Sequence, residues 1–226
     1  MKASLLSALM LLGVVSSAHI KTKVSSNLKT LAEAKAETMS AHSCTYSIER
    51  FKQGPADYKS IIGSGKKYTD TSFAADSEMI RWDDRAKSGL GASLKTYVKS
   101  TSFSRIRDTF PGAKLFGSEI SPFDIYQGRL ADCYWIAATA ATANGDPDRI
   151  KEIFVTDDYN NEGIFAVNLY IKGKKETITV DDYVPIYNGK PLGNNPFKQD
   201  GDWWGAILEK AWAKINNNYE SINWGW

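Results

Sequence analysis

The sequence predicts an α+β fold that is mainly helical and carries one β-hairpin. An Ala-rich stretch from Asp132 to Ala143 is followed by Asn144-Gly145, a pattern typical of a closely packed helix with a stop signal. Residues 164–171 alternate as in a strand, and together with residues 177–180 across a glycine turn they predict a hairpin. Residues 203–219 place large apolar side chains three and four positions apart, which predicts an amphipathic helix.

The composition is that of a single globular domain. The chain has 226 residues, of which 42% are hydrophobic, and a formal net charge of +2. A chain of this length can bury a normal hydrophobic core. Its Lys and Arg residues are interspersed with Asp and Glu and form no basic stripe, so we expect no nucleic acid as a partner.

The first 18 residues predict a secretory signal peptide. Lys2 precedes an apolar run over residues 5–15, and residues 16–18 are small, as a cleavage site after Ala18 requires. The apolar run is too short to span a bilayer of about 30 Å, and no later segment reaches transmembrane length. We therefore expect a protein of the secretory pathway, either secreted or delivered to a vacuole-like or lysosome-like compartment, with no membrane span after cleavage.

Residues 19–52 predict either a removable pro-region or a loosely attached N-terminal arm. They are rich in Lys, Ala and Glu and show the spacing of only one amphipathic helical turn. Residues 53–67 contain four Gly and Pro residues, which indicates a loop at the start of the main folded region, 53–226.

Acidic residues near the ends of these elements carry further expectations. Asp202 is a candidate N-cap for the helix that begins at Trp203. Asp181 and Asp182 form an adjacent acidic pair at the end of a strand, where consecutive side chains point to opposite faces. Paired carboxylates that act as acid and base must converge on one point, so we interpret this pair as structural.

Cys133 and Gln127 together predict half of a nucleophilic site. Cys133 is expected at a helix N-terminus, where unpaired N–H groups and the helix dipole favour a thiolate. Gln127, beside the glycine turn at Gly128, offers a neutral amide donor for the oxyanion that forms during acyl transfer. The chain has only two cysteines, too few for a disulfide framework, and a Cys44–Cys133 disulfide is the alternative to a free thiol.

The stretch around Cys133 resembles the calpain-type branch of the papain-like cysteine proteases. The family pattern is Gln-Gly-x-Leu-Gly-Asp-Cys-Trp, and residues 127–134 read QGRLADCY. Ala131 replaces a Gly and Tyr134 replaces a Trp, so a small residue and an aromatic residue are retained. The similarity continues in order over roughly residues 68–222, through segments 68–73, Trp82, 124–125, 163–165, 179–185 and 204–220.

This resemblance implies a papain-like fold whose mainly helical first lobe carries Cys133 as the nucleophile and Gln127 as the oxyanion donor. The family places its base His and its orienting Asn in a second, β-rich lobe. The histidines of this chain, His19 and His42, both precede Cys133. We therefore expect residues 53–226 to form an incomplete catalytic domain without the second lobe, and the chain alone to be inactive.

Two further features bear on the resemblance. The C-terminal stretch 223–226, Asn-Trp-Gly-Trp, is similar to a motif of the second lobe, but no His precedes it in the required region, and we interpret it as a loop. The family also binds calcium through carboxylates and carbonyls, which implies Asp124 and Asp202 as metal ligands. Their alternatives are a turn cap at Asp124 and the helix N-cap at Asp202; the chemistry itself requires no cofactor, and calcium would act as an activator.

The leading functional prediction is a calpain-like cysteine endopeptidase that acts on protein or peptide substrates, with a second protease lobe as partner in the complete protein. The alternative is a catalytically inactive one-lobe protein that binds or regulates a partner in the secretory pathway. A third interpretation, a Trp-rich secreted binding module, depends on the Cys44–Cys133 disulfide.

Overall fold

The computed structural model describes residues 57–80, 99–196 and 201–223, all of which belong to a compact unit that spans Arg50–Trp226. The predicted signal peptide and the 19–52 arm lie outside the described residues, as do Cys44 and both histidines. The described residues combine helices with two small sheets, which confirms the predicted α+β class.

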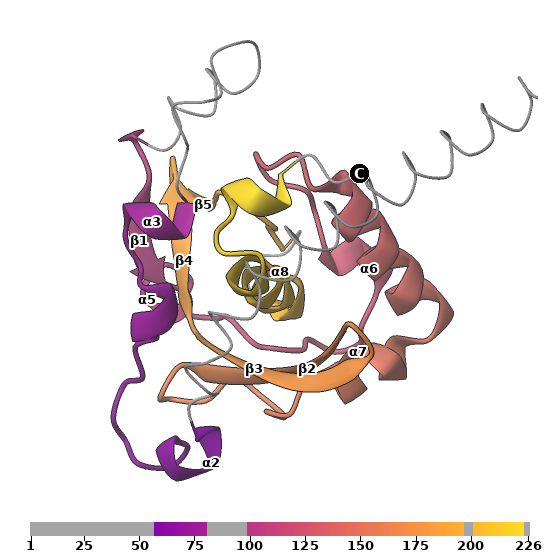
Figure 1. Ribbon diagram of the computed structural model, residues 1–226, viewed down its shortest axis with the longest axis horizontal. Coiled ribbons are helices and arrows are strands. Elements are labelled where there is room, and N and C mark those ends of the chain that lie inside the picture. The colour runs from indigo at the N-terminus through magenta and orange to yellow at the C-terminus, as the bar shows by residue number, and fades with distance from the viewer. Residues whose placement is uncertain (1–56, 81–98, 197–200, 224–226) are drawn as a thin grey trace, which may run out of the picture. The chain divides into compact units, whose positions relative to one another are not determined.

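The elements follow one another in a mixed order along the chain (Figure 1). The α-helices are α2 (Tyr58–Ile61), α3 (Ser77–Ile80), α5 (Ile106–Thr109), α6 (Cys133–Gly145), α7 (Pro147–Ile153) and α8 (Trp204–Ile215). The short 3-10 helices of the described ranges are η1 (Thr71–Phe73), η2 (Pro122–Asp124) and η3 (Glu220–Ile222). The strands are β1 (Ser102–Arg105), β2 (Ile164–Ile171), β3 (Lys174–Asp181), β4 (Tyr183–Tyr187) and β5 (Lys190–Pro191).

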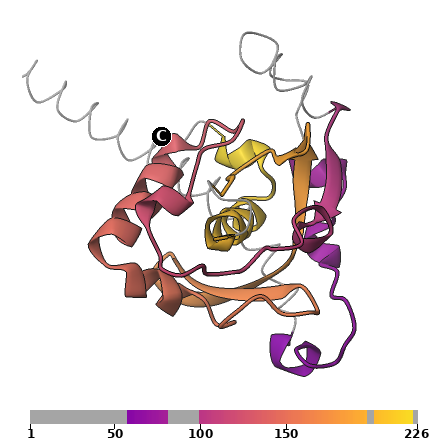
Figure 2. The ribbon, with the colours of Figure 1, turned by 180° about the vertical axis from the view of Figure 1, so that it is seen from behind.

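Helix α8 is the central element of the described fold. Figures 1 and 2 show it end-on, with the β2–β3 hairpin, the β1–β4 pair and α6 arranged around it. Its sequence is apolar on most sides, as expected for a helix that is surrounded by other elements. The buried positions include two charged residues among the apolar ones, and run from Trp204 to Ala211 without a break.

The predicted helix over 203–219 is confirmed in its central part but ends early. Helix α8 stops at Ile215, because Asn216 caps it and Asn217 adopts a positive φ of 91°, a conformation that Asn tolerates better than most residues. The predicted N-cap, Asp202, is wrong. Trp203 occupies that position without a side-chain cap, and the Asp202 carboxylate instead accepts the distant peptide N–H of Gly117.

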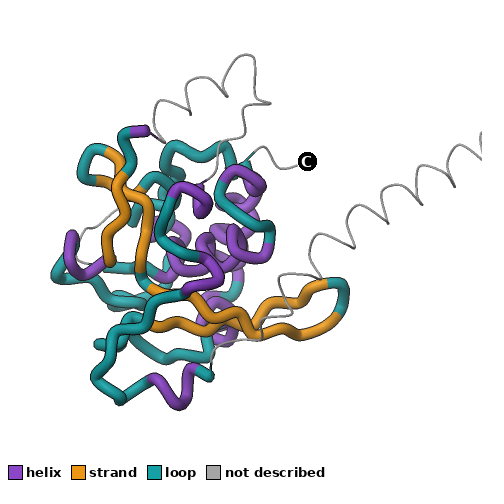
Figure 3. Tube along the Cα trace, turned by 60° about the vertical axis from the view of Figure 1, so that its left-hand side comes forward, coloured by secondary structure: helices purple, strands orange, loops and turns teal. Residues whose placement is uncertain are grey.

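The predicted hairpin is confirmed, with a second strand longer than expected. Strands β2 and β3 pair antiparallel, with Ile164 opposite Asp181 at one end and Ile171 opposite Lys174 at the turn. The turn residues Lys172 and Gly173 both have positive φ, as a two-residue hairpin turn requires. Figure 3 shows this turn projecting from the rest of the described chain, whereas the first four residues of β2 are buried on both faces.

A second sheet, β1-β4-β5, was not predicted from the sequence. Strand β4 pairs antiparallel with β1, and Pro185 lies opposite Phe103 in the register. Pro185 lacks an N–H group and lowers the strand signal, although its carbonyl accepts the Leu192 N–H at 2.8 Å. Helix α7 was also missed, because Asp146 and Pro147 are typical of a turn but serve as its N-cap and first residue.

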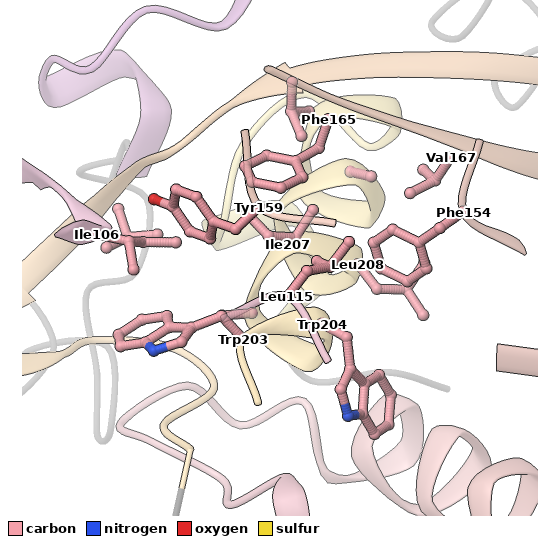
Figure 4. Packing of buried hydrophobic residues seen from close by; sticks show 14 of the residues in the cluster. Ile106, Leu115, Phe154, Tyr159, Phe165, Val167, Trp203, Trp204, Ile207 and Leu208 are labelled. Atoms are coloured by element: carbon pink, nitrogen blue, oxygen red, sulfur yellow. The ribbon is translucent and has the colours of Figure 1, made fainter. Parts of the chain in front are cut away.

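The hydrophobic core lies between α8, the hairpin and α6 (Figure 4). Phe165 from β2 packs edge-on against Tyr159, with 5.1 Å between the ring centres. Trp203, the N-cap residue of α8, packs against Phe110 with 4.8 Å between the ring centres. Aromatic pairs of this kind contribute about 0.5–1.5 kcal/mol beyond the area they bury, and the Trp203–Phe110 pair helps to fix the start of α8.

A buried ion pair joins α8 to the end of the hairpin. Lys210 on α8 has no exposed side-chain surface, and its ammonium group contacts the Asp181 carboxylate. The same ammonium donates to the Asp181 carbonyl at 3.1 Å and to the Tyr183 carbonyl at 2.6 Å. The second Asp181 carboxylate oxygen accepts the Asp70 N–H at 2.7 Å. Every donor of this buried cation therefore has a partner.

The neighbouring Asp182 is held separately. Its carboxylate contacts the guanidinium of Arg105 at the end of β1 and accepts the Tyr159 hydroxyl at 2.8 Å. Arg105 also donates to the Tyr68 carbonyl at 2.6 Å. Because Asp181 and Asp182 pair with different cations, the structural interpretation of this acidic pair is confirmed.

Replacing Lys210 with Met should lower the free energy of unfolding by about 3–5 kcal/mol, because the Asp181 carboxylate would stay buried without its cation. Lys151→Met is the matched control, since Lys151 lies on α7 with its side chain 58% exposed, 4.0 Å from Asp148, and such surface pairs contribute about 0–1 kcal/mol. Urea denaturation followed by circular dichroism measures both losses. Equal losses for the two variants would contradict this account of the pair.

Candidate active site

Cys133 is the first residue of α6, and its thiol is free and exposed. The predicted helix is confirmed and runs on to Gly145. The preceding residue, Asp132, accepts the N–H groups of Trp135 and Ile136 with its main-chain carbonyl, but its side chain makes no cap hydrogen bond. The N–H groups of the first turn are therefore not taken up by the capping side chain, and they keep the partial positive charge of a helix N-terminus.

Gln127 is half-buried and is held by the loop that leads to Cys133. Its Nε2 donates to the Leu130 carbonyl at 2.6 Å, and Leu130 itself is buried. A primary amide has two N–H donors, so this contact orients the group and leaves a second donor. The amide is therefore fixed by the same loop that ends at Cys133.

The segment that bears Gln127 is paired with a neighbouring stretch of chain. The Tyr126 carbonyl accepts the Asn195 N–H at 2.9 Å, and the Arg129 N–H donates to the Leu192 carbonyl at 2.7 Å. Gly128 lies between these two hydrogen bonds, where a side chain would collide with the neighbouring carbonyl oxygens. Main-chain pairing on both sides therefore fixes the position of Gln127.

Gln127 lines a polar groove of about 440 Å³. It runs along the Gln127 segment toward the β4–β5 turn and carries aromatic, amide and basic groups on its walls. The residues that line it are Tyr126, Gln127, Gly128, Arg129, Tyr187, Asn188, Lys190, Pro191 and Asn195.

The end of η3 and the residue that follows it pack against the start of α6 and the loop before it. The Tyr134 hydroxyl donates to the Ile222 carbonyl at 3.1 Å and accepts the Trp212 Nε1–H at 3.1 Å. The Asn223 side-chain oxygen accepts the Ala131 N–H. No local pattern signals this contact, because residues 223–226 carry only the composition of a loop, and residues 224–226 lie outside the described range.

The two predicted metal ligands occupy neighbouring segments. Asp124 forms a capping box with Ser121, accepts its N–H at 2.6 Å, and accepts the Trp204 Nε1–H at 3.3 Å. The turn-cap alternative for Asp124 is therefore confirmed as its structural role. Asp202, two residues before Trp204, accepts the Gly117 N–H.

Both carboxylates already accept N–H donors, and each keeps lone pairs that a hard cation such as calcium prefers. In the part of the chain that the structure describes, no three His, Cys, Asp or Glu side chains cluster as metal ligands do. Calcium binding at Asp124 and Asp202 would therefore need further main-chain carbonyl ligands, and it stays a prediction. Within the described ranges, no helix has the length and apolar character needed to cross a membrane.

Comparison with known proteins identifies the family of the chain. A family model described as calpain family cysteine protease matches residues 68–226. The chain belongs to the calpain family of cysteine proteases. The resemblance seen around Cys133 and Gln127 is thereby confirmed at the level of the family, and the matched region contains all the residues of the site.

Similar relatives come from plants and animals. The chain is 30% identical over 169 residues to a calpain-type cysteine protease, ADL1, of Oryza sativa subsp. japonica, an alignment that covers 74% of this chain and 8% of the relative. It is 27% identical over 175 residues to calpain-A of Drosophila melanogaster, covering 75% and 20%. It is 28% identical over 175 residues to the calpain-1 catalytic subunit of Macaca fascicularis, covering 75% and 24%. The chain therefore matches only a minor part of the length of these calpain relatives.

Gly128→Ala should destabilise the fold by about 1–3 kcal/mol and displace the Gln127 segment, because the added methyl group would overlap the carbonyl oxygens of Leu192 and Gly193. Gly145→Ala is the matched control, since an added Cβ there meets no atom within 4 Å. Thermal denaturation of the two variants measures the difference. If Gly128→Ala were as stable as Gly145→Ala, the close approach at this segment would be contradicted.

Proposed function

We propose that this chain carries the nucleophile-bearing lobe of a papain-like, calpain-type cysteine endopeptidase. The observation that carries the proposal is the placement of an exposed free thiol, Cys133, at the first residue of α6, with the tethered amide of Gln127 on the same loop. Membership of the calpain family supports a protein or peptide as the substrate. The predicted signal peptide supports a location in the secretory pathway.

The first chemical step is attack of the Cys133 thiolate on a peptide carbonyl carbon. A carbon–sulfur bond forms, and the carbonyl π electrons move to the oxygen, which becomes an oxyanion. The Cys133 main-chain N–H and the second N–H of Gln127 are the donors for this oxyanion. Loss of one such donor typically costs a factor of about 10²–10³ in kcat.

Collapse of the intermediate breaks the carbon–nitrogen bond and needs a proton for the departing amine. The helix N-terminus favours a thiolate but supplies no proton, so a general acid must come from elsewhere. By the resemblance, that group is a His oriented by an Asn in a second, β-rich lobe, and it also activates the water that hydrolyses the acyl-enzyme. The complete activity therefore belongs to an assembly of both lobes.

Labelling with a peptidyl epoxide that is selective for papain-like thiols tests the nucleophile. We expect the folded chain to be modified at Cys133, located by mass spectrometry of the labelled peptide, and Cys133→Ala to lose the modification. Cys44→Ala is the matched control and should keep it. Equal labelling of the wild type and Cys133→Ala would refute the assignment, and an unreactive Cys133 in the folded chain would favour the one-lobe binding protein.

Calcium as an activator is tested by its effect on stability. If Asp124 and Asp202 hold the ion, calcium at 100 times its Kd should raise the free energy of unfolding by about 2.7 kcal/mol. Asp124→Asn should reduce this gain, because it removes a charged ligand while its amide oxygen can still accept the Ser121 N–H. Magnesium is the control cation, since its strict octahedral geometry suits carbonyl-rich sites poorly. A wild-type chain whose denaturation is unchanged by calcium would contradict the prediction.

A further inference from the structure

A buried polar cluster lies directly behind Cys133. Asp132 is completely buried, and no N–H or hydroxyl donor of the described residues reaches either of its carboxyl oxygens. Glu209 on α8 is 2% exposed, and both of its carboxyl oxygens lie 2.9 Å from the Asn194 N–H. Burying a carboxylate without a hydrogen-bond donor costs free energy. Asp132 therefore needs an interaction other than a bond from an N–H or hydroxyl donor.

The Glu209 carboxyl group lies close enough to that of Asp132 for a side-chain hydrogen bond between the two groups. Ionised carboxyl groups are acceptors only, so a bond between them requires that one of them carries a proton. Burial raises the pKa of Asp132, and burial together with the neighbouring Asp132 charge raises the pKa of Glu209 well above its usual range. Both effects favour a pair that retains one proton.

The other titratable groups around the pair do not supply a compensating charge. Burial, followed by the two carboxyl groups, raises the pKa of Tyr219, and burial also raises the pKa of Tyr134, so both phenols stay neutral. The Cys133 thiol is the next residue along the chain. None of the ion pairs among the described residues includes Asp132 or Glu209. The positive charge that compensates the two carboxylates is therefore a proton bound by the pair itself.

Glu209 also connects the two halves of the candidate active site. It holds the peptide N–H of Asn194, and the next residue, Asn195, donates to the Tyr126 carbonyl beside Gln127. Gly193 allows this approach, because a side chain there would collide with the Glu209 carboxyl group. The Glu209 carboxyl group thus lies beside Asp132 of the Cys133 loop and is linked to the Gln127 segment through the hydrogen-bonded stretch Asn194–Asn195.

We propose that Asp132 and Glu209 form a carboxyl pair that shares one proton and positions the Cys133 loop against the Gln127 segment. Glu209 is a positioning residue, since it reaches the reacting atoms only through Asp132 and Asn194. This inference rests on the proposed function in treating Cys133 and Gln127 as nucleophile and oxyanion donor. The sharing of the proton is a property of the folded chain that does not depend on peptide hydrolysis.

The shared proton makes stability depend on pH in a defined direction. An unfolded Glu loses its proton near pH 4.3, whereas the folded pair still holds one above that pH. The folded chain then binds more protons than the unfolded chain, so stability falls as pH rises until the pair itself ionises. Glu209→Gln keeps an acceptor for the Asn194 N–H and an amide donor for Asp132, but it cannot titrate.

Urea denaturation of the full chain between pH 5 and pH 8 tests the pair. Relative to the wild type, the folding equilibrium constants of Glu209→Gln and Asp132→Asn should rise by up to tenfold per pH unit, the slope of one bound proton. Glu152→Gln, on the exposed side of α7, is the matched control and should run parallel to the wild type. Parallel behaviour of Glu209→Gln and Asp132→Asn as well would overturn the proposal.

Infrared spectroscopy of the wild type provides a measurement that needs no variant to fold. We expect the C=O stretch of a protonated carboxyl group at neutral pH in the folded chain, and its loss on unfolding. Absence of this band from the folded wild-type chain would overturn the shared proton.

The positioning role is measured by the rate of Cys133 alkylation by iodoacetamide as a function of pH, followed by mass spectrometry of the Cys133 peptide. Glu209→Gln should keep the wild-type midpoint, because the charge next to the thiol is unchanged. Glu209→Leu should shift it, because Asp132 loses its partner. A wild-type profile for Glu209→Leu would overturn the positioning role. Since no peptide is hydrolysed, this result is independent of whether the epoxide test supports the protease proposal.

Discussion

The contact between Lys210 and Asp181 is the constraint on which the rest of the described structure depends. A buried ammonium group must have a partner for each of its donors, and these partners come from one short stretch at the end of the hairpin, including the Tyr183 carbonyl. Asp181 then uses its second oxygen to hold the main chain at Asp70. The hairpin, the segment at Asp70 and α8 therefore meet at one point, and separating α8 from the hairpin would leave a buried charge unpaired.

The position of α8 also determines how the side chains next to Cys133 are arranged. Lys210 follows Glu209 directly, so the contact that fixes one side of the helix also fixes the direction of the adjacent carboxyl group. Glu209 reaches Asp132 behind Cys133 and the Asn194 peptide beside the Gln127 segment. The stability of the core and the arrangement of the candidate site are consequently properties of one helix.

The features that could be predicted from the sequence are those whose signal is local. The hairpin and α8 have clear periodicity, and the residue pattern around Cys133 and Gln127 is sufficient by itself to indicate the family. The β1-β4-β5 sheet was missed because β4 contains Pro185 and its partners are short. The prediction of Asp202 as a helix cap is wrong because its actual partner, Gly117, is 85 residues away.

The role of Glu209 was also missed, although a signal was present. A Glu-Lys pair within the buried, apolar part of a helix indicates that both charges have buried partners. The identity of those partners, Asp132 for Glu209 and Asp181 for Lys210, depends on contacts that the sequence does not record. Long-range pairing of this kind follows from the fold and cannot be inferred from spacing.

The adjacency of Glu209 and Lys210 also fixes the rotational register of α8. Consecutive residues on a helix are about 100° apart, so a slip of one residue in one direction would turn Glu209 toward Asp181, and a slip in the other direction would turn Lys210 toward the Asn194 N–H. The first slip would bring two carboxylates together at the hairpin, and the second would bring an ammonium group against a peptide N–H. Apolar packing alone tolerates small rotations, whereas either of these contacts is electrostatically unfavourable, so the two charges define one rotational position of the helix.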